Sequence, residues 1–334
     1  MNKNNLIENK IHFDSELFGL INESEKRLQM LSGSLALLKE SDPIITFLIY
    51  REAQKSILIS QPDFPVNDFY KDLIGESGKN HRVILNYADA LLLGQKLIRN
   101  VSDSVHIIRS IHDELNKNIS PGSTRAIPED ETLPQMDDLR KEISANISYP
   151  NAVRAAIIHA RFDLLDPFKE NSGATARILA QLLLLWKKQL PFPVLQLSGQ
   201  LLKKKIEYTE LLNDLKRGDN PERWIKFYLR TICDSSEETL LIIKNIFSMR
   251  EEHYKIITEK EFASASVLKF LNLLLKRPVI SLPFVTKELG FNKQNANTII
   301  AKFLDENIIE EITGQKRNRL FTYKKYLNIL EQDK

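Results

Sequence analysis

The sequence predicts an all-α protein, and two features of the chain support this prediction. Glycine and proline are scarce, with 11 and 13 among 334 residues, which argues against folds assembled from many tight turns. Apolar residues recur three and four positions apart through most of the chain, for example at Leu28, Leu31 and Leu35, and this spacing places them on one helix face. Only the C-terminal part carries short β-rich runs. We therefore expect helices, followed by one β-hairpin near the end of the chain.

The first half of the chain is predicted to form helices separated by two loops. The helical period covers residues 16–60, 80–101 and 105–118. A loop with prolines and an aspartate at 61–65 ends the first stretch. Prolines and a glycine interrupt the pattern over 120–134, where we expect an exposed loop.

The second half begins with a predicted helix, loop and helix. A helix over 150–166 starts at Pro150, where the missing N–H costs nothing, and stops before Pro167. A polar loop over 168–174 follows, and Thr175 opens the most apolar helix of the chain. Further helices are predicted over 196–216, 221–260, 263–276, 282–289 and 293–307, and strands over 308–312 and 320–323. Three short helices and a hairpin at the C-terminus predict a winged-helix domain.

Charge and cysteine content narrow the function classes. The 47 basic and 44 acidic residues leave a formal charge of +3, too little to imply nucleic-acid binding by the whole molecule, so any such activity must be local. One cysteine, Cys233, cannot form an internal disulfide or a cysteine-rich zinc site. The N-terminus lacks the apolar core of a signal peptide, and the longest apolar run, 178–186, is too short to cross a membrane. We expect a cytoplasmic protein that does not contact a membrane.

The central helix, loop and helix carry a recognisable motif. Residues 159–177 read H-A-R-F-D-L-L-D-P-F-K-E-N-S-G-A-T-A-R. This segment resembles the signature of the Fic family, H-A-x-F-x-x-I-H-P-F-x-D/E-G-N-G-R-x-x-R, and the resemblance extends over nearly the whole chain. It implies an N-terminal helical region at 1–78, a Fic core domain with the helical Fic fold at 79–259, and a winged-helix domain at 260–334.

The resemblance implies a specific chemistry. In active members the motif histidine is a general base for a hydroxyl that attacks the α-phosphate of ATP, the acidic residue holds Mg²⁺, and AMP is transferred to a protein side chain. Here Asp166 stands at the position of the histidine, and Glu170 stands at the acidic position. An aspartate, with an ordinary pKa near ~3.9, is a much weaker base than a histidine near ~6.5.

The phosphate-binding part of the motif is also altered. Asn171 replaces the first glycine, Ser172 the asparagine and Ala174 the first arginine, whereas Gly173 and Arg177 match. The lost arginine removes a charged donor that the resemblance would place on phosphate oxygens. We therefore expect nucleotide binding that is at most weak and that centres on Gly173 and Arg177.

Two further family elements are missing. Self-inhibiting members carry a glutamate that pairs with the second motif arginine, and Ser60 occupies its position in the stretch 52–61. The family's target-holding flap normally lies between segments that correspond here to 122–125 and Pro128, which only residues 126–127 separate. A chain without the base, the inhibitory glutamate and the flap resembles a protein that no longer performs the reaction.

Each motif residue also has a simpler interpretation. Asp166 suits a turn at the end of a helix, and Glu170 suits a solvated carboxylate in the first turn of the next helix, so we assign no metal site beyond Glu170 as a candidate for Mg²⁺. Arg177 has two alternatives, an anion or a carbonyl oxygen. His159 lies seven residues before the base position, where a hydrogen-bonded structural histidine is expected.

The C-terminal domain offers a separate candidate interface. Asn292 is predicted to cap the third helix, whose inner face is Ala296, Ile300 and Phe303. The nucleic-acid candidates are Lys293, Gln294, Asn295, Asn297 and Lys302 on this helix, and Lys316, Arg317 and Arg319 on the hairpin. Nearby acidic residues make the local charge only mildly basic. We predict DNA binding, with docking to a protein as the alternative.

These observations together predict a catalytically degenerate Fic-family protein that acts as a DNA-binding or partner-binding regulator. The alternative is an adenylyltransferase, or a related nucleotidyl or phosphoryl transferase, with altered active-site residues. No resident cofactor is expected, and ATP and Mg²⁺ are implied only if family activity persists. A homodimer would suit a winged helix that reads paired half-sites.

Overall fold

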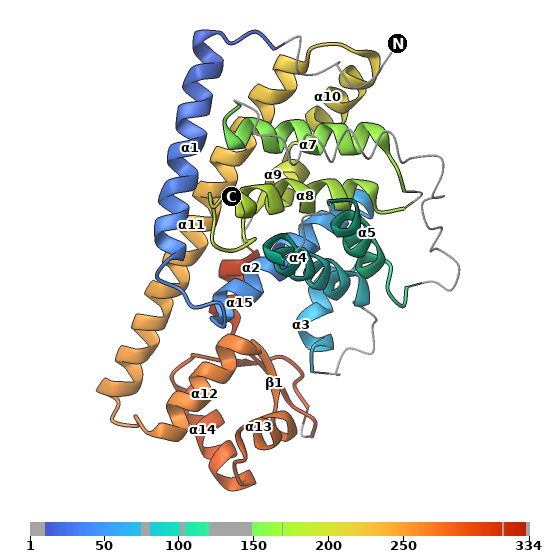
Figure 1. The fold of residues 1–334 in the computed structure, drawn as a ribbon. Helices are drawn as coiled ribbons and strands as arrows, with labels where there is room; N and C mark the ends of the chain where they lie inside the picture. The colour runs from blue at the N-terminus through green and yellow to red at the C-terminus, as the bar shows by residue number, and fades with distance from the viewer. Residues whose placement is uncertain are drawn as a thin grey trace. The chain divides into compact units, whose positions relative to one another are not determined.

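The computed structural model describes residues 11–74, 81–100, 104–119, 149–168, 170–315 and 317–331. Over these residues the protein is all-α, as predicted, apart from one small sheet (Figure 1). The chain forms two compact units: Met1–Phe64 with Arg82–Leu240, and Pro65–His81 with Leu241–Lys334. The three-part division at residues 78 and 259 stays a prediction.

The first predicted helical stretch folds as two helices, α1 (Ser15–Leu35) and α2 (Pro43–Ser60). A side-chain oxygen of Asp14 caps α1, and a side-chain oxygen of Asp42 caps α2 just before Pro43. Proline at the first helical position and a capping aspartate before it favour a new helix start. The apolar period therefore continues across a break that the caps enforce.

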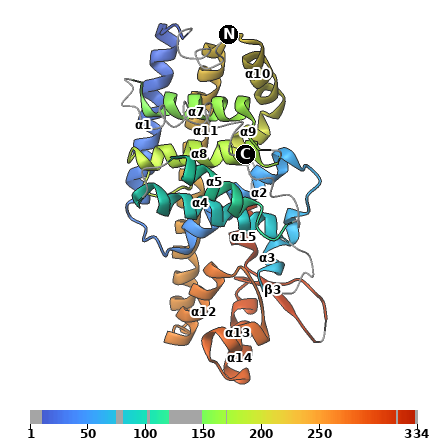
Figure 2. The ribbon, with the colours of Figure 1, turned by 45° about the vertical axis from the view of Figure 1, so that its right-hand side comes forward.

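The rest of the first unit consists of helices that pack around a buried pair. They are α4 (Arg82–Asn100), α5 (Ser104–Leu115), α7 (Asn151–Leu165), α8 (Ser172–Trp186), α9 (Leu197–Lys203), α10 (Lys205–Arg217) and the N-terminal part of α11 (Pro221–Glu259). α7 lies beside α8, and α4 and α5 pack against each other and against α8 (Figures 1 and 2). α2 contacts α4, α8 and α9. Nearly every side chain of α8 is buried, which explains why its sequence is apolar on all sides.

Charged pairs hold α1 alongside the first part of α11 (Figure 1). The ammonium group of Lys226 lies 2.6 Å from a carboxylate oxygen of Asp14 and 2.8 Å from one of Glu16. Arg27 Nη1 of α1 lies 3.6 Å from Glu237 Oε2 of α11. These contacts join residues far apart in sequence, so they fix α1 against the helical core.

The second unit contains the only sheet of the described residues. Its elements are η3 (Val66–Asp68), α3 (Phe69–Asp72), the C-terminal part of α11, α12 (Ala265–Lys276), β1 (Val279–Ser281), α13 (Leu282–Leu289), α14 (Lys293–Asp305), β2 (Glu310–Glu311), β3 (Leu320–Thr322) and α15 (Lys324–Glu331). The sheet is antiparallel with the order β1-β3-β2, and Phe321 of β3 lies opposite Ile280 of β1 and Glu311 of β2. The sequence did not predict β1, because three residues give no alternation to recognise.

The core of the second unit forms around aromatic residues. The rings of Phe270 and Phe303 meet edge to face with centroids 4.8 Å apart, a favourable geometry for aromatic pairs. The predicted inner face of α14 is confirmed, since Ala296, Ile300 and Phe303 are buried. The predicted cap is confirmed as well, because Asn292 Oδ1 accepts a hydrogen bond of 2.8 Å from the N–H of Asn295.

Candidate functional site

The motif loop joins α7 to α8 through two residues with left-handed backbone. Asp166 ends α7 with φ 41°, and Asn171 precedes α8 with φ 60°. Asp and Asn are among the non-glycine residues that adopt this conformation most readily. Ser172 Oγ accepts from the N–H of Phe168 at 3.1 Å and donates to its carbonyl at 2.9 Å. Because this bond closes the loop, α8 begins at Ser172, three residues before the predicted start.

His112 on α5 and Asn116 just after this helix hold the loop, and neither is among the residues predicted from the sequence. The ring of His112 stacks on Phe168 with centroids 3.6 Å apart, and its Nε2 lies 3.2 Å from the carbonyl oxygen of Glu170. Asn171 donates from Nδ2 to Oδ1 of Asn116 at 2.9 Å. Burial lowers the pKa of His112, so this ring is a neutral packing element. The four-residue spacing of His112 and Asn116 places both on one helix face. This spacing does not indicate which loop they contact.

A pocket of about 310 Å³ opens beside this loop. Ser56, Ile57 and Ser60 of α2 line it, together with Gln61, the residue that follows this helix. The remaining walls come from α4, α5 and the motif, as Val83, Tyr87, Leu115, Asn116, Ile119, Glu170, Asn171, Ala174 and Arg177. The structure thus brings five predicted site residues together: Ser60, Glu170, Asn171 and Arg177 line the pocket, and Gly173 adjoins Arg177.

Of the described residues that line this pocket, Arg177 alone is basic, and it is buried, with 2% of its surface exposed. Its Nε donates to Ser56 Oγ at 2.9 Å and its Nη2 donates to the Ser56 carbonyl at 3.2 Å. Among the described residues it has no carboxylate within 4.0 Å. The guanidinium thus hydrogen-bonds only neutral acceptors and forms no direct ion pair among the described residues, while Asp163 and Glu52 act on it at longer range. Of the two alternatives in the sequence analysis, the carbonyl contact is present in the structure.

Gly173 lets the guanidinium approach the start of α8. A methyl group at this position would lie 3.3 Å from Arg177 Nη1 and 3.7 Å from Asp163 Oδ2. Asn171 makes no side-chain cap to α8, because its amide is turned toward Asn116. The first turn of α8 therefore carries no side-chain cap beside a buried cation, an arrangement that suits an anion.

Tyr87 contributes a further polar group. Tyr87 lines the pocket, and its buried hydroxyl makes no hydrogen bond to the described residues. Burial raises its pKa above the ordinary value, so the hydroxyl stays protonated and able to donate. A buried donor without a partner costs stability, which a bound acceptor would restore.

A buried polar network lies on the other side of Arg177. His159 is fully buried, and its ring nitrogens each lie 3.0 Å from a tyrosine hydroxyl, Nδ1 from Tyr228 and Nε2 from Tyr208. Burial, and secondarily the charge of Arg177, lowers the pKa of His159 to about 3. The histidine is therefore neutral and structural, as expected from its place in the motif. Burial also raises the pKa of Asp163, although Arg177 opposes this shift.

The two motif carboxylates occupy different positions. Asp166 is exposed and does not line the pocket, whereas Glu170 is exposed and lines it. Across the part of the chain that the structure describes, no group of three histidine, cysteine or acidic residues lies together as a metal site would require. The role of Glu170 as a magnesium ligand stays a prediction. The predicted flap region at 122–128 lies outside the described residues.

The predicted nucleic-acid residues lie on α14 and on the segment between β2 and β3. Lys293, Gln294, Asn297, Lys302, Arg317 and Arg319 are exposed, Asn295 is half-buried, and Lys316 lies outside the described residues. Two of the cations already have partners. Arg319 pairs with Glu311 at 2.5 Å and covers the ring of Phe321, and Lys302 covers the ring of Phe262. Arg317 has no ion pair among the described residues.

No helix in the described ranges is both long enough and apolar enough to span a bilayer.

Comparisons with known proteins agree with this architecture. Residues 103–184 match the model of the Fic/DOC family. A Fic family protein from Desulfovibrio desulfuricans G20 superposes with a TM-score of 0.56 at 12% identity, over 93% of this chain and 96% of the other. A fragment of Fic-1 from C. elegans, carrying one substitution, superposes with a TM-score of 0.54 at 16% identity, over 67% of this chain and 72% of the other. At these identities the structural likeness concerns the fold.

Proposed function

Residues 103–184 belong to the Fic/DOC family, and from this premise we propose that the chain is a catalytically degenerate Fic-fold protein. It binds an anion weakly at the motif pocket and acts as a regulator through DNA or a protein partner. The observation that carries the first half is that the residue at the position of the family base does not lie at the pocket. Asp166 occupies the position of the family histidine, yet it is exposed and does not line the pocket.

The other polar groups at the pocket favour binding over proton transfer. Arg177 is permanently charged, the Tyr87 hydroxyl is protonated, and Ser56 already bonds the guanidinium. None of these groups accepts a proton readily near neutral pH. They can stabilise a phosphate or carboxylate, but they leave an attacking hydroxyl without a base.

Nearby carboxylates limit the affinity for a triphosphate. Asp163 lies next to Gly173, and Glu170 lines the pocket. Each would repel the additional charges of ATP unless a cation came with it. A small dianion at Arg177 and the start of α8 still lies near Asp163, but it does not extend toward Glu170 and carries less charge than ATP, so it meets less repulsion. We therefore expect phosphate to bind and ATP to bind at most weakly.

Incubation with ATP and Mg²⁺ tests the loss of catalysis. Intact-mass measurement of the full chain should find no added AMP. Labelled ATP should likewise leave no AMP on the proteins of an added extract. Asp166→His alone should not restore transfer, since Asn171, Ser172 and Ala174 remain in the loop. Robust labelling by the wild type or by the Asp166→His variant would instead support the alternative, a nucleotidyl or phosphoryl transferase with altered active-site residues.

Calorimetry tests the binding half. The heat of binding of phosphate or ATP should be lost in Arg177→Ala, because this variant lacks the basic group among the described lining residues. Lys244→Ala, an exposed change on α11 far along the sequence from the motif, is the matched control. Micromolar ATP binding that survives Arg177→Ala would contradict the proposal.

The regulatory half rests on the second unit. Its order of helix, strand, two helices and two strands, with β3 between the other two strands, is the arrangement expected of a winged helix. α14 exposes Lys293, Gln294 and Asn297 on the side opposite its buried face. Lysine and amide side chains are suited to phosphate and base-edge contacts.

Fluorescence anisotropy with genomic fragments and the full chain tests DNA binding. Gln294→Ala and Asn297→Ala should change the preference among sequences, whereas Lys293→Ala should weaken binding to all of them. Thr286→Ala, on α13, serves as the control. Affinity weaker than ~10⁻⁴ M at physiological salt, below ordinary non-specific binding, would favour a protein partner instead.

A further inference from the structure

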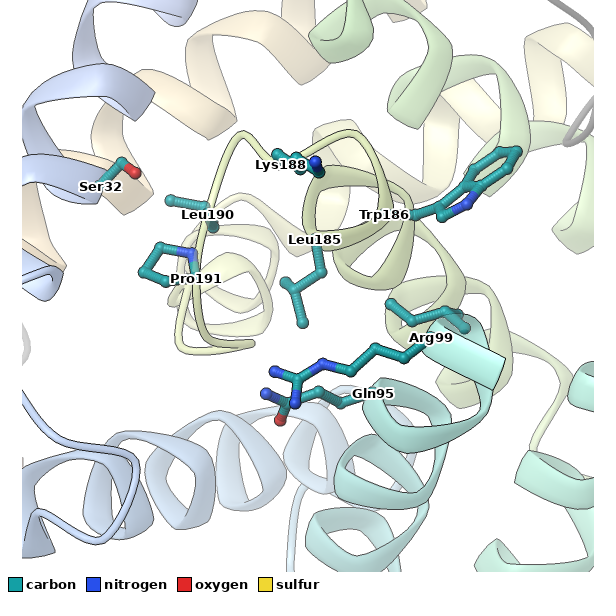
Figure 3. A pocket seen from close by; sticks show the side chains of 9 residues that line it. Ser32, Gln95, Arg99, Leu185, Trp186, Lys188, Leu190 and Pro191 are labelled. Carbon is teal, nitrogen blue, oxygen red and sulfur yellow. The ribbon is translucent and has the colours of Figure 1, made fainter. Parts of the chain in front are cut away.

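A second pocket of about 600 Å³ lies in the first unit, at the C-terminal ends of α4 and α8 (Figure 3). It shares no lining residue with the motif pocket. Its walls come from α1, α4, and α8 with the turn that follows, as Ser32, Gln95, Ile98, Arg99, Leu185, Trp186, Lys188, Leu190 and Pro191. The volume falls within the range of small-molecule sites.

Gln95 places an unsatisfied donor in this pocket. Its side chain is 3% exposed, and Nε2 has no hydrogen-bond partner among the described residues. In Figure 3 the Gln95 side chain extends from α4 into the space below Leu185. Buried amide groups are almost always hydrogen-bonded, so a donor left unpaired in a cavity indicates that the cavity receives an acceptor.

The charged residues that line the pocket within the described part of the chain are both basic. They are Arg99 and Lys188. Neither cation forms an ion pair within the described part of the chain. Arg99 extends from α4 on the same side as Gln95 (Figure 3). A cation and a neutral hydrogen-bond donor therefore lie in the same part of the pocket. This combination matches a carboxylate, which accepts from both kinds of group.

The remaining lining is mostly apolar. Ile98, Leu185, Leu190 and Pro191 form a wall that would exclude water from an apolar ligand. Trp186 at the edge is 39% exposed, and Lys187 lies over its ring at 4.1 Å. A ligand that fills the pocket must therefore join a charged end to an apolar body.

We propose that this pocket binds a small organic carboxylate with an apolar or aromatic body. Its carboxylate accepts a hydrogen bond from Gln95 Nε2 and pairs with Arg99, while its body covers Leu185 and Leu190. The site is separate from the motif pocket, so it does not depend on the function proposed above.

Calorimetry with two isosteric probes tests the site on the full chain. 2-Naphthoate should bind at least tenfold more tightly than the neutral 2-naphthamide, because only the former carries the charge that Arg99 attracts. Arg99→Gln should remove this preference while retaining the amide's affinity. Gln95→Leu should weaken both probes, since both present an acceptor oxygen.

A blocking variant separates the site from other surfaces. Ser32→Trp adds bulk at the half-buried rim on α1 and should abolish binding of both probes without changing the melting temperature. Lys244→Gln should bind like the wild type. The proposal is overturned if naphthoate gives no heat up to about 1 mM, if the two probes bind equally, or if naphthoate binding survives Ser32→Trp.

Discussion

Two buried arginines of the first unit differ in how their charge is balanced. Arg51 on α2 and Arg177 on α8 are 1% and 2% exposed. Arg51 lies 2.6 Å from a carboxylate oxygen of Glu238 and donates to Gln196 at 2.9 Å. Arg177 donates hydrogen bonds to the hydroxyl and carbonyl of Ser56 and forms no ion pair among the described residues. Similar burial thus accompanies two electrostatic settings: Arg51 is paired directly with a carboxylate, whereas Arg177 is not.

The largest difference between them should appear in stability. Arg51→Met removes the buried partner of Glu238, which keeps Lys203 at 3.5 Å and Gln200 at 2.7 Å. The loss should therefore lie toward the lower end of the about 3–5 kcal/mol that breaking a buried pair costs. Arg177→Met removes a charge with no carboxylate partner, so we expect a change within about 1 kcal/mol. Urea denaturation of both variants measures the two free energies of unfolding. Equal losses would show that the two arginines are equally structural.

Glu52, next to Arg51 on α2, lies close enough to both arginines for its pKa to report on them. Burial raises its pKa to about 7, against the lowering effects of its bonds to Ser198 and then of Arg177 and Arg51. The folded state therefore keeps this proton after the unfolded state has lost it. The stability contributed by the protonated carboxyl is complete below about 4.5, the unfolded value, and is lost as pH rises to about 7.

Glu52→Gln isolates this effect. The variant should gain stability relative to the wild type between those two pH values, by up to roughly 3 kcal/mol. Unfolding curves of both proteins across this window give the difference, in which the shared titration of other groups cancels. A difference that stays constant with pH would mean that Arg177 and Arg51 keep the carboxylate ionised.

A smaller effect is expected from added phosphate. At ten times its dissociation constant, phosphate should stabilise the wild type by about 1.4 kcal/mol, because it binds only the folded site. Arg177→Gln should abolish the rise in melting temperature. Sodium chloride at matched ionic strength controls for general salt effects, and a rise that persists in the variant would place the anion elsewhere.

The smallest expected effect is on the salt dependence of DNA binding by the second unit. Here too one arginine is paired with a carboxylate and the other is not, but both are exposed. Arg319 is paired with Glu311, whereas Arg317 has no ion pair among the described residues. If the segment between β2 and β3 contacts phosphates, Arg317→Ala should reduce the slope of log affinity against log salt by about 0.9, the value for one contact. Arg319→Ala should change it less. Anisotropy between low and moderate salt measures both slopes, and equal changes would show that DNA displaces Glu311.

The all-α class and most helix positions follow from the sequence alone, because apolar spacing and capping residues act locally. Asn292, for example, caps α14 as predicted. The motif and its missing histidine are also evident from the sequence. Local signals were less exact at the motif loop, where Ser172 bonds Phe168 four positions earlier and α8 begins before the predicted residue. They also missed β1, which exists because β3, some forty positions later, pairs with it.

The surroundings of the motif residues, by contrast, depend on how distant helices pack. Arg177 has Ser56, 121 positions earlier, as its neighbour, and His112 and Asn116 hold a loop more than fifty positions ahead. The second pocket is likewise assembled from α1, α4 and α8. Burial and the presence of a counter-charge depend on which elements pack together, and a local pattern of residue types does not contain that information.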